Sequence, residues 1–172
     1  RHVETRARAL GDPGSLAFAA LLDAHGSSER RALIEAATVP HSWLFRDAVQ
    51  LEAVSAALCD RPRGPLAIWV AGCAGGEDAV TFTVLAQACG HTPTTLATDV
   101  NETALARART GRFDAWRARE LPTSARRAFD PDERDGVIAK ASVKERIVYE
   151  RHSVLDAIPT TSRADAFDLI VC

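Results

Sequence analysis

The feature that most constrains the fold is a strand, glycine-rich turn, helix and strand unit between residues 66 and 98. Residues 66–71 form an apolar run without polar alternation, which is typical of a strand covered on both faces of a parallel sheet. Residues 78–89 carry apolar side chains at helical spacing, and residues 94–98 form the next apolar run. A helix between two buried strands makes a βαβ unit, so the sequence predicts an α/β fold with an open parallel sheet.

Helical patterns come before this unit. We expect a first helix from Ser15, a second from Glu29 to Ala37 and a third from about Ser42 to Leu58, together forming a small helical domain or cap. The breaker cluster at residues 61–65, rich in proline and glycine, marks the start of the α/β layer.

Two further strands are expected after the βαβ unit. Asn101 caps a helix that Gly111 closes, and strands follow at residues 147–149 and 167–172. The sequence stops inside this fourth strand, so we expect a sheet that is incomplete at its C-terminus. A central strand left as an edge exposes unpaired backbone groups. We therefore expect the fragment alone to be inactive, poorly soluble or paired with another chain.

Length and composition narrow the class of protein. The 172 residues suffice for one domain, or for a helical module joined to part of a larger domain. A formal net charge of −2 disfavours nucleic acid as a partner, and no apolar run is long enough for membrane insertion. No export signal is visible, so we expect a cytoplasmic location. The four cysteines lack CxxC spacing, and we interpret them as reduced, mostly packing thiols.

The candidate site is the turn at residues 71–77, between the first strand and its helix. Gly72 and its neighbouring glycines allow either a tight structural turn or close approach of a ligand to the backbone. Asp99 ends the second strand, where an open α/β sheet holds a ribose, and we expect Glu77 at the mouth of the same crevice. Two carboxylates without a basic residue in the turn favour a cationic or uncharged adenosyl ligand over a pyrophosphate. The glycine spacing also disfavours a nicotinamide enzyme, and S-adenosylmethionine fits better.

The motifs around this turn resemble the CheR-type chemotaxis receptor methyltransferases. The run Trp69 to Asp78 is similar to that family's W-S-A-G-C-S-T-G-E-E, and residues 96–101 are similar to L-A-T-D-I-D/N. Residues 42–47 resemble T-x-F-F-R-[DE], residues 106–113 resemble A-R-x-G-x-Y, and residues 167–172 match the strand that precedes R-N. The resemblance covers residues 38 to 172. It implies a Rossmann-like S-adenosylmethionine methyltransferase domain there, after a partial helical domain at residues 1–37.

The resemblance also implies a set of site residues. Those carried over as contacts of S-adenosylmethionine, or of its product S-adenosylhomocysteine, are Ser42, Arg46, Gly72, Glu77, Asp99, Ser153 and Val154, with Arg46 also expected in catalysis. Three positions depart from the family pattern. Pro40 replaces an asparagine, Ser42 replaces a threonine, and Ser153 offers a hydroxyl where the family has an amide.

The implied reaction is methyl transfer to a glutamate carboxylate on the cytoplasmic helices of a chemoreceptor or a similar signalling protein. The alternative is a catalytically silent CheR-like module that binds cofactor or product and acts in regulation or docking. The arginines from Arg107 to Arg127 are interpreted as a solvated face, with contact to an acidic receptor helix as the alternative.

Overall fold

The computed structural model describes residues 28–39, 41–133, 135–159 and 167–172. The chain divides into two units, Arg1–Val39 and Pro40–Cys172. In the first unit, helix α3 spans Ser28–Ala37, close to the expected second helix. The helix expected from Ser15, and the departure at Pro40, lie outside the described residues.

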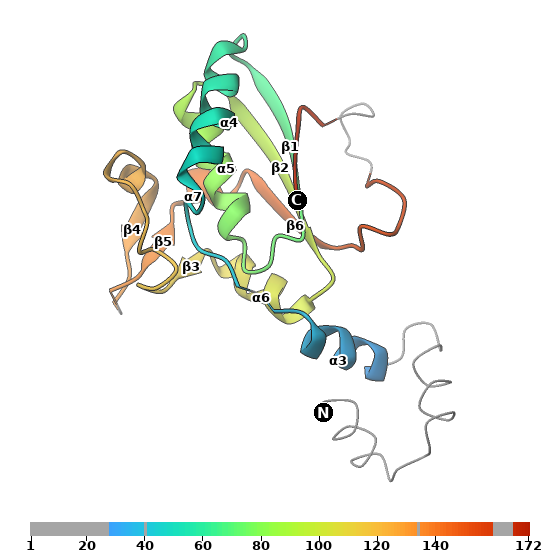
Figure 1. Ribbon diagram of the computed structural model, residues 1–172. Coiled ribbons are helices and arrows are strands. Elements are labelled where there is room, and N and C mark those ends of the chain that lie inside the picture. The colour runs from blue at the N-terminus through green and yellow to red at the C-terminus, as the bar shows by residue number, and fades with distance from the viewer. Residues whose placement is uncertain (1–27, 40, 134, 160–166) are drawn as a thin grey trace. The chain divides into compact units, whose positions relative to one another are not determined.

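The second unit is built on a parallel sheet of four strands, which confirms the predicted α/β class (Figure 1). The strands are β1 (Pro65–Ala71), β2 (Thr92–Asp99), β6 (Ile147–Arg151) and β7 (Leu169–Val171), in the spatial order β6-β2-β1-β7. All three strand pairs are parallel, so all four carboxyl ends lie along one edge. The strand order reverses between β1 and β7, which is where open α/β sheets bind ligands.

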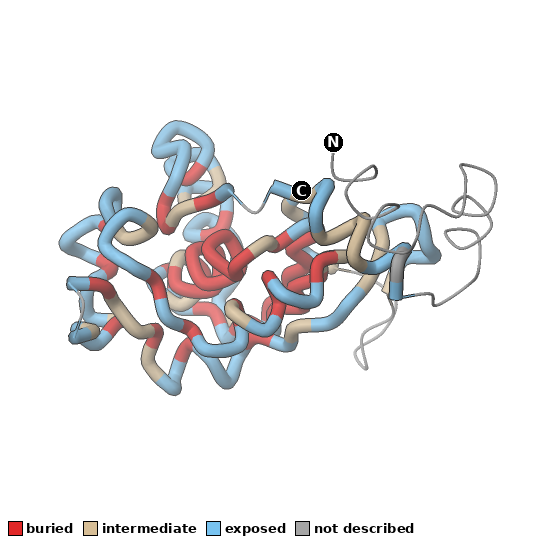
Figure 2. Tube along the Cα trace, turned by 90° about the horizontal axis from the view of Figure 1, so that it is seen from below, coloured by how far each residue is buried: buried red, intermediate tan, exposed pale blue. Residues whose placement is uncertain are grey.

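Helices α4 (Ala48–Asp60) and α5 (Glu77–Ala88) lie on one face of this sheet (Figure 1). Nine of the twelve residues of α5 are buried, because the helix lies between the sheet and α4. Helix α6 (Glu102–Thr110) follows β2, begins at the Asn101 cap and ends at Gly111, as the sequence predicts. The core gathers around α5 and the facing strands, in the middle of the unit in Figure 2.

The third helix begins later than expected. Phe45 and Asp47 have φ angles of 57° and 60°, which a right-handed helix cannot include, and the Asp47 side chain accepts from the Gln50 amide instead. Residues 42–47 are therefore an extended and turned segment, and the expectation of a helix from Ser42 is wrong.

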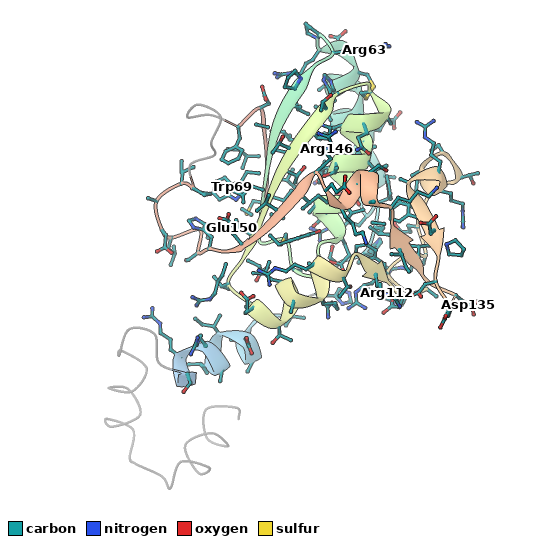
Figure 3. The ribbon with its side chains drawn as sticks, turned by 180° about the vertical axis from the view of Figure 1, so that it is seen from behind. Arg63, Trp69, Arg112, Asp135, Arg146 and Glu150 are labelled. Atoms are coloured by element: carbon teal, nitrogen blue, oxygen red, sulfur yellow. A yellow bond between two sulfur atoms is a disulfide. The ribbon has the colours of Figure 1, made fainter. Side chains whose placement is uncertain are left out.

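The opposite face of the sheet carries a second apolar row. Trp69 is in register with Leu96 on one side and with Ile170 on the other, and Leu96 is in register with Val148. Trp69 and Leu96 are buried, whereas Val148 and Ile170 are about half exposed. The place of Trp69 on this face can be followed in Figure 3.

A three-stranded antiparallel sheet, absent from the sequence prediction, lies between α6 and β6 in the chain. Its strands are β3 (Arg112–Phe113), β4 (Phe129–Pro131) and β5 (Val137–Ala139), in the order β3-β5-β4. The 3₁₀ helix η1 (Thr123–Ala128) precedes β4, and the short helix α7 (Ala141–Lys144) follows β5. Strands of two or three residues carry too little alternation to be recognised in sequence. Arg112 and Asp135 mark this sheet in Figure 3.

The interpretation of the cysteines as reduced thiols is wrong for one pair. Cys59 at the end of α4 and Cys89 after α5 form a disulfide across 30 residues, while Cys73 and Cys172 are free. The packing of α4 against α5 brings the two helix ends together, which spacing along the sequence does not reveal. None of the described helices is long and apolar enough to cross a membrane.

Candidate functional site

The glycine-rich turn at residues 72–76 lies at the carboxyl edge of the sheet, between β1 and α5. The amides of Gly72 and Cys73 both donate to the Thr98 carbonyl, at 2.8 and 2.9 Å, which fastens the turn to β2. Gly72 and Gly76 have φ angles of +74° and +88°. Space is open in front of Gly72, where a side chain would meet nothing within 4 Å. The turn thus presents exposed backbone at the point where the strand order reverses.

Asp99 joins the turn to the beginning of α6. Its Oδ2 accepts from the Ala74 amide and its Oδ1 from the Asn101 amide, both at 2.8 Å. An ionised carboxylate can accept about four hydrogen bonds, so acceptor capacity for a diol remains. The side chain is partly exposed at the end of β2. The predicted position of Asp99 agrees with the structure, and its carboxylate also organises the loop.

Glu77 is not at the mouth of the crevice, which corrects the sequence prediction. Its side chain is 1% exposed and lies beneath the turn, where Oε1 accepts from Arg117 Nε at 2.8 Å. A Cβ added to Gly75 would lie 2.7 Å from Oε1 and 2.8 Å from Arg107 Nη2, so a larger residue there would displace these two side-chain ends. Glu77 Oε2 and two nitrogens of Arg107 are buried without a hydrogen-bond partner.

Burial controls the ionisation of these groups. It raises the pKa of Glu77 above the usual 4.5, and the positive charges of Arg117 and Arg107 oppose that rise. It also raises the pKa of the Cys73 thiol to about 12, with help from the nearby carboxylates of Asp99 and Glu77. Cys73 therefore stays protonated at neutral pH and does not act as a nucleophile.

Arg46 and Asp78 form a two-pronged ion pair beside the turn. Arg46 Nε donates to Oδ1 at 3.2 Å and Nη2 donates to Oδ2 at 2.8 Å. Burial raises the pKa of Asp78, while Arg46 and the nearby Ser42 hydroxyl favour its charged form. Ser42 itself is buried, and its hydroxyl makes no hydrogen bond of normal geometry. The segment is held to α5 by the Phe45 amide, which donates to Thr81 Oγ1 at 3.0 Å.

A cavity of about 350 Å³ lies between this ion pair and the end of β7. Its polar lining consists of Arg46, Asp47, Gln50 and Asp78, its apolar lining includes Trp43 and Phe82, and it reaches Val171 and Cys172. The cavity therefore has a charged wall and an apolar wall, at the side of the sheet where the strand order reverses.

Ser153 and Val154 follow β6 at the same edge of the sheet. The His152 amide donates to the Asp99 carbonyl at 3.1 Å, so this loop is fastened to the end of β2. The Ser153 hydroxyl accepts from the Leu155 amide at 3.2 Å, and Val154 is 60% exposed. An exposed apolar side chain and a hydroxyl that can still donate suit the edge of a planar base.

The sequence did not predict the ion pairs of the two buried carboxylates, Glu77 and Asp78. Asp78 stands in the glycine-turn motif, but nothing in the sequence pairs it with Arg46. Arg117 was interpreted as part of a solvated face, and the structure shows that this is wrong for Arg117 and for the partly buried Arg107. Arg117 is 40 residues from Glu77, so only the tertiary fold brings the two together.

Comparison with known proteins decides the family. The model of the CheR methyltransferase, SAM binding domain, matches residues 41–172. This chain belongs to the CheR methyltransferase family. A chemotaxis protein methyltransferase of Listeria innocua serovar 6a is 29% identical over 117 residues, covering 67% of this chain and 43% of that protein. An "Uncharacterized 104.1 kDa protein in hypE 3'region" of Rhodobacter capsulatus is 27% identical over 184 residues, covering all of this chain and 19% of that protein. The chain thus spans less than half the length of either relative.

The cofactor of this CheR domain is S-adenosylmethionine, and the site fits it on three observations. Open space lies in front of the Gly72 backbone, the Asp99 carboxylate retains acceptor capacity, and the Ser153 hydroxyl, which accepts one hydrogen bond, can still donate one. No group of His, Cys, Asp and Glu side chains among the described residues could hold a metal ion.

Proposed function

We propose that this chain transfers a methyl group from S-adenosylmethionine to glutamate side chains of a chemoreceptor-like protein in the cytoplasm. The observation that carries the proposal is the carboxyl edge of the sheet, where open space in front of the Gly72 backbone lies beside the Asp99 carboxylate, in a chain that matches the CheR methyltransferase SAM binding domain. The similarity to a chemotaxis protein methyltransferase supports a protein of a chemotaxis system as the acceptor, and glutamate as the methylated residue is what the resemblance to CheR-type enzymes implies.

Within this proposal the cofactor is held by residues from four elements. Gly72 offers backbone at the turn, Asp99 accepts the ribose hydroxyls, and Ser153 with Val154 borders the adenine. Ser42 and Arg46 approach from the segment before α4. Glu77 supports the site from beneath the turn, because its side chain is fully buried there.

The chemistry requires little acid or base assistance. When bound, S-adenosylmethionine supplies a methyl group on a positively charged sulfur. A glutamate carboxylate has an ordinary pKa of about 4.3 and is already ionised near neutral pH, so no general base is needed. Arg46 can steady that carboxylate, since its Nη1 takes no part in the pair with Asp78. Apolar side chains that line the cavity, Trp43 and Phe82 among them, reduce the water around the nucleophile.

A transfer assay tests the proposal. The complete gene product that contains these 172 residues is incubated with methyl-labelled S-adenosylmethionine and the cytoplasmic fragment of a chemoreceptor, and the product is treated with mild base. Glutamyl methyl esters release labelled methanol under these conditions, whereas methylated nitrogen does not. Cofactor binding without base-labile transfer would contradict methyl esterification and would support the silent regulatory module.

A further inference from the structure

One short segment, Asp114–Leu121, joins the two halves of the site. The Leu44 amide donates to the Arg117 carbonyl at 2.8 Å, and the Arg117 side chain donates to Glu77. The Arg119 guanidinium lies 3.8 Å from the ring centre of Trp43 and 3.9 Å from that of Trp116. The segment therefore contacts both residues 42–46 and the helix that starts at the glycine turn.

Arg117 is the central member of this segment. Its side chain is 20% exposed, and it reaches the buried Glu77 through Nε and the exposed Asp114 through Nη1. A planar guanidinium binds two carboxylates in fixed directions, which a flexible ammonium cannot reproduce. The side chain of Arg117 is thus fixed in place, and its carbonyl group is the acceptor for Leu44.

We propose that Arg117 is a positioning residue for the cofactor site. It holds Glu77 beneath the glycine turn, and through its own carbonyl it holds the segment with Ser42 and Arg46 against α5. Arg117 touches neither reactant; it acts through Glu77 and Leu44. The inference rests on the proposed function only in that it assumes the site binds the adenosyl cofactor.

The surroundings of Glu77 make Arg117 hard to replace. The charged and titratable groups facing Glu77 are Arg117, Arg107 of α6, Cys73 of the turn and Tyr149 of β6. Burial raises the pKa of both Cys73 and Tyr149, so these two stay neutral. Without Arg117, the buried carboxylate keeps a single cation, Arg107. Its ionised form is then disfavoured, and we expect the pKa of Glu77 to rise further.

Two variants and one control test the proposal on the complete gene product that contains these 172 residues. Arg117→Gln removes the charge, Arg117→Lys retains it, and Arg112→Gln is the control because the exposed Arg112 side chain pairs with Asp132 on the small antiparallel sheet. We expect Arg117→Gln to weaken S-adenosylhomocysteine binding about 10-fold, equivalent to about 1.4 kcal/mol, in a calorimetric titration. Arg117→Lys should recover part of this loss, and Arg112→Gln should bind like the wild type.

Two further measurements separate positioning from a general loss of structure. In the ligand-free chain, Arg117→Gln should move the carboxyl ¹³C titration midpoint of Glu77 to higher pH. It should also speed amide exchange at Leu44, while exchange in the sheet is unchanged. Binding by Arg117→Gln should strengthen as pH rises and Glu77 ionises, and Arg117→Gln combined with Glu77→Gln should lose this dependence.

The outcomes are distinguishable. A wild-type chain that fails to bind S-adenosylhomocysteine overturns the proposed function and the inference with it. Wild-type binding with unchanged affinity and an unchanged Glu77 midpoint in Arg117→Gln overturns the inference alone. If Arg117→Gln does not fold, Arg117→Lys decides, because full wild-type affinity together with unchanged exchange at Leu44 would show that the guanidinium is not needed.

Discussion

Substitution of Gly76 and Gly72 separates two energetic costs of a side chain at the glycine turn, backbone strain and steric overlap. Both residues have positive φ, but a Cβ at Gly76 would lie 2.7 Å from the Tyr149 hydroxyl and 3.0 Å from the Ala108 Cβ. A Cβ at Gly72 would meet nothing within 4 Å. Gly72→Ala therefore tests backbone strain alone, whereas Gly76→Ala adds steric overlap between the turn, α6 and β6.

The magnitudes follow from these contacts. A non-glycine residue in the left-handed region costs roughly 1–2 kcal/mol, which is the expected loss for Gly72→Ala. Overpacking a closed site adds about 1–3 kcal/mol, so we expect Gly76→Ala to lose roughly 2–5 kcal/mol of unfolding free energy. Removing the Tyr149 hydroxyl relieves the shorter of the two contacts. Gly76→Ala should consequently be less destabilising in a Tyr149→Phe background than in the wild type.

Urea unfolding of the four single and double variants measures these differences as shifts in midpoint at constant slope. Tyr149→Phe alone is the control for the loss of the hydroxyl. Equal destabilisation by Gly72→Ala and Gly76→Ala would refute the packing explanation. So would a Gly76→Ala penalty that is the same with and without the Tyr149 hydroxyl.

Three other measurements test the site and the fold. Asp99→Ala should weaken S-adenosylhomocysteine binding roughly 5- to 150-fold, or about 1–3 kcal/mol, by calorimetry, and unchanged affinity would contradict the placement of the site. Burial raises the pKa of Glu77 above 4.5 in the folded state, so its contribution to stability should fall as pH rises through that pKa. The unfolding free energy of wild type minus that of Glu77→Gln should thus decrease with pH, and a flat or rising difference would contradict this sign. Reducing the disulfide across 30 residues should cost about 3–4 kcal/mol, and Cys59→Ser should be insensitive to reductant.

Local sequence determined the main elements and the position of the turn. The apolar run at residues 66–71 and the glycines after it predict a buried strand followed by a sharp turn, because both depend on residue type over a few positions. The Asn101 cap and the Gly111 terminus of α6 were predicted for the same reason and are confirmed. Asp99 was placed correctly, since a residue that ends a parallel strand must lie at the carboxyl edge.

Only the tertiary structure decided the partners of the buried charges. Glu77 lies beneath the turn because Arg117, 40 residues away, donates to it there. Arg46 meets Asp78 because Phe45 and Asp47 adopt left-handed backbone angles that turn the segment toward α5. Cys59 meets Cys89 because α4 packs on α5. Ion pairs and disulfides depend on distances in the folded molecule. The periodicity of a sequence indicates helices and strands, but it does not show which distant residues come into contact.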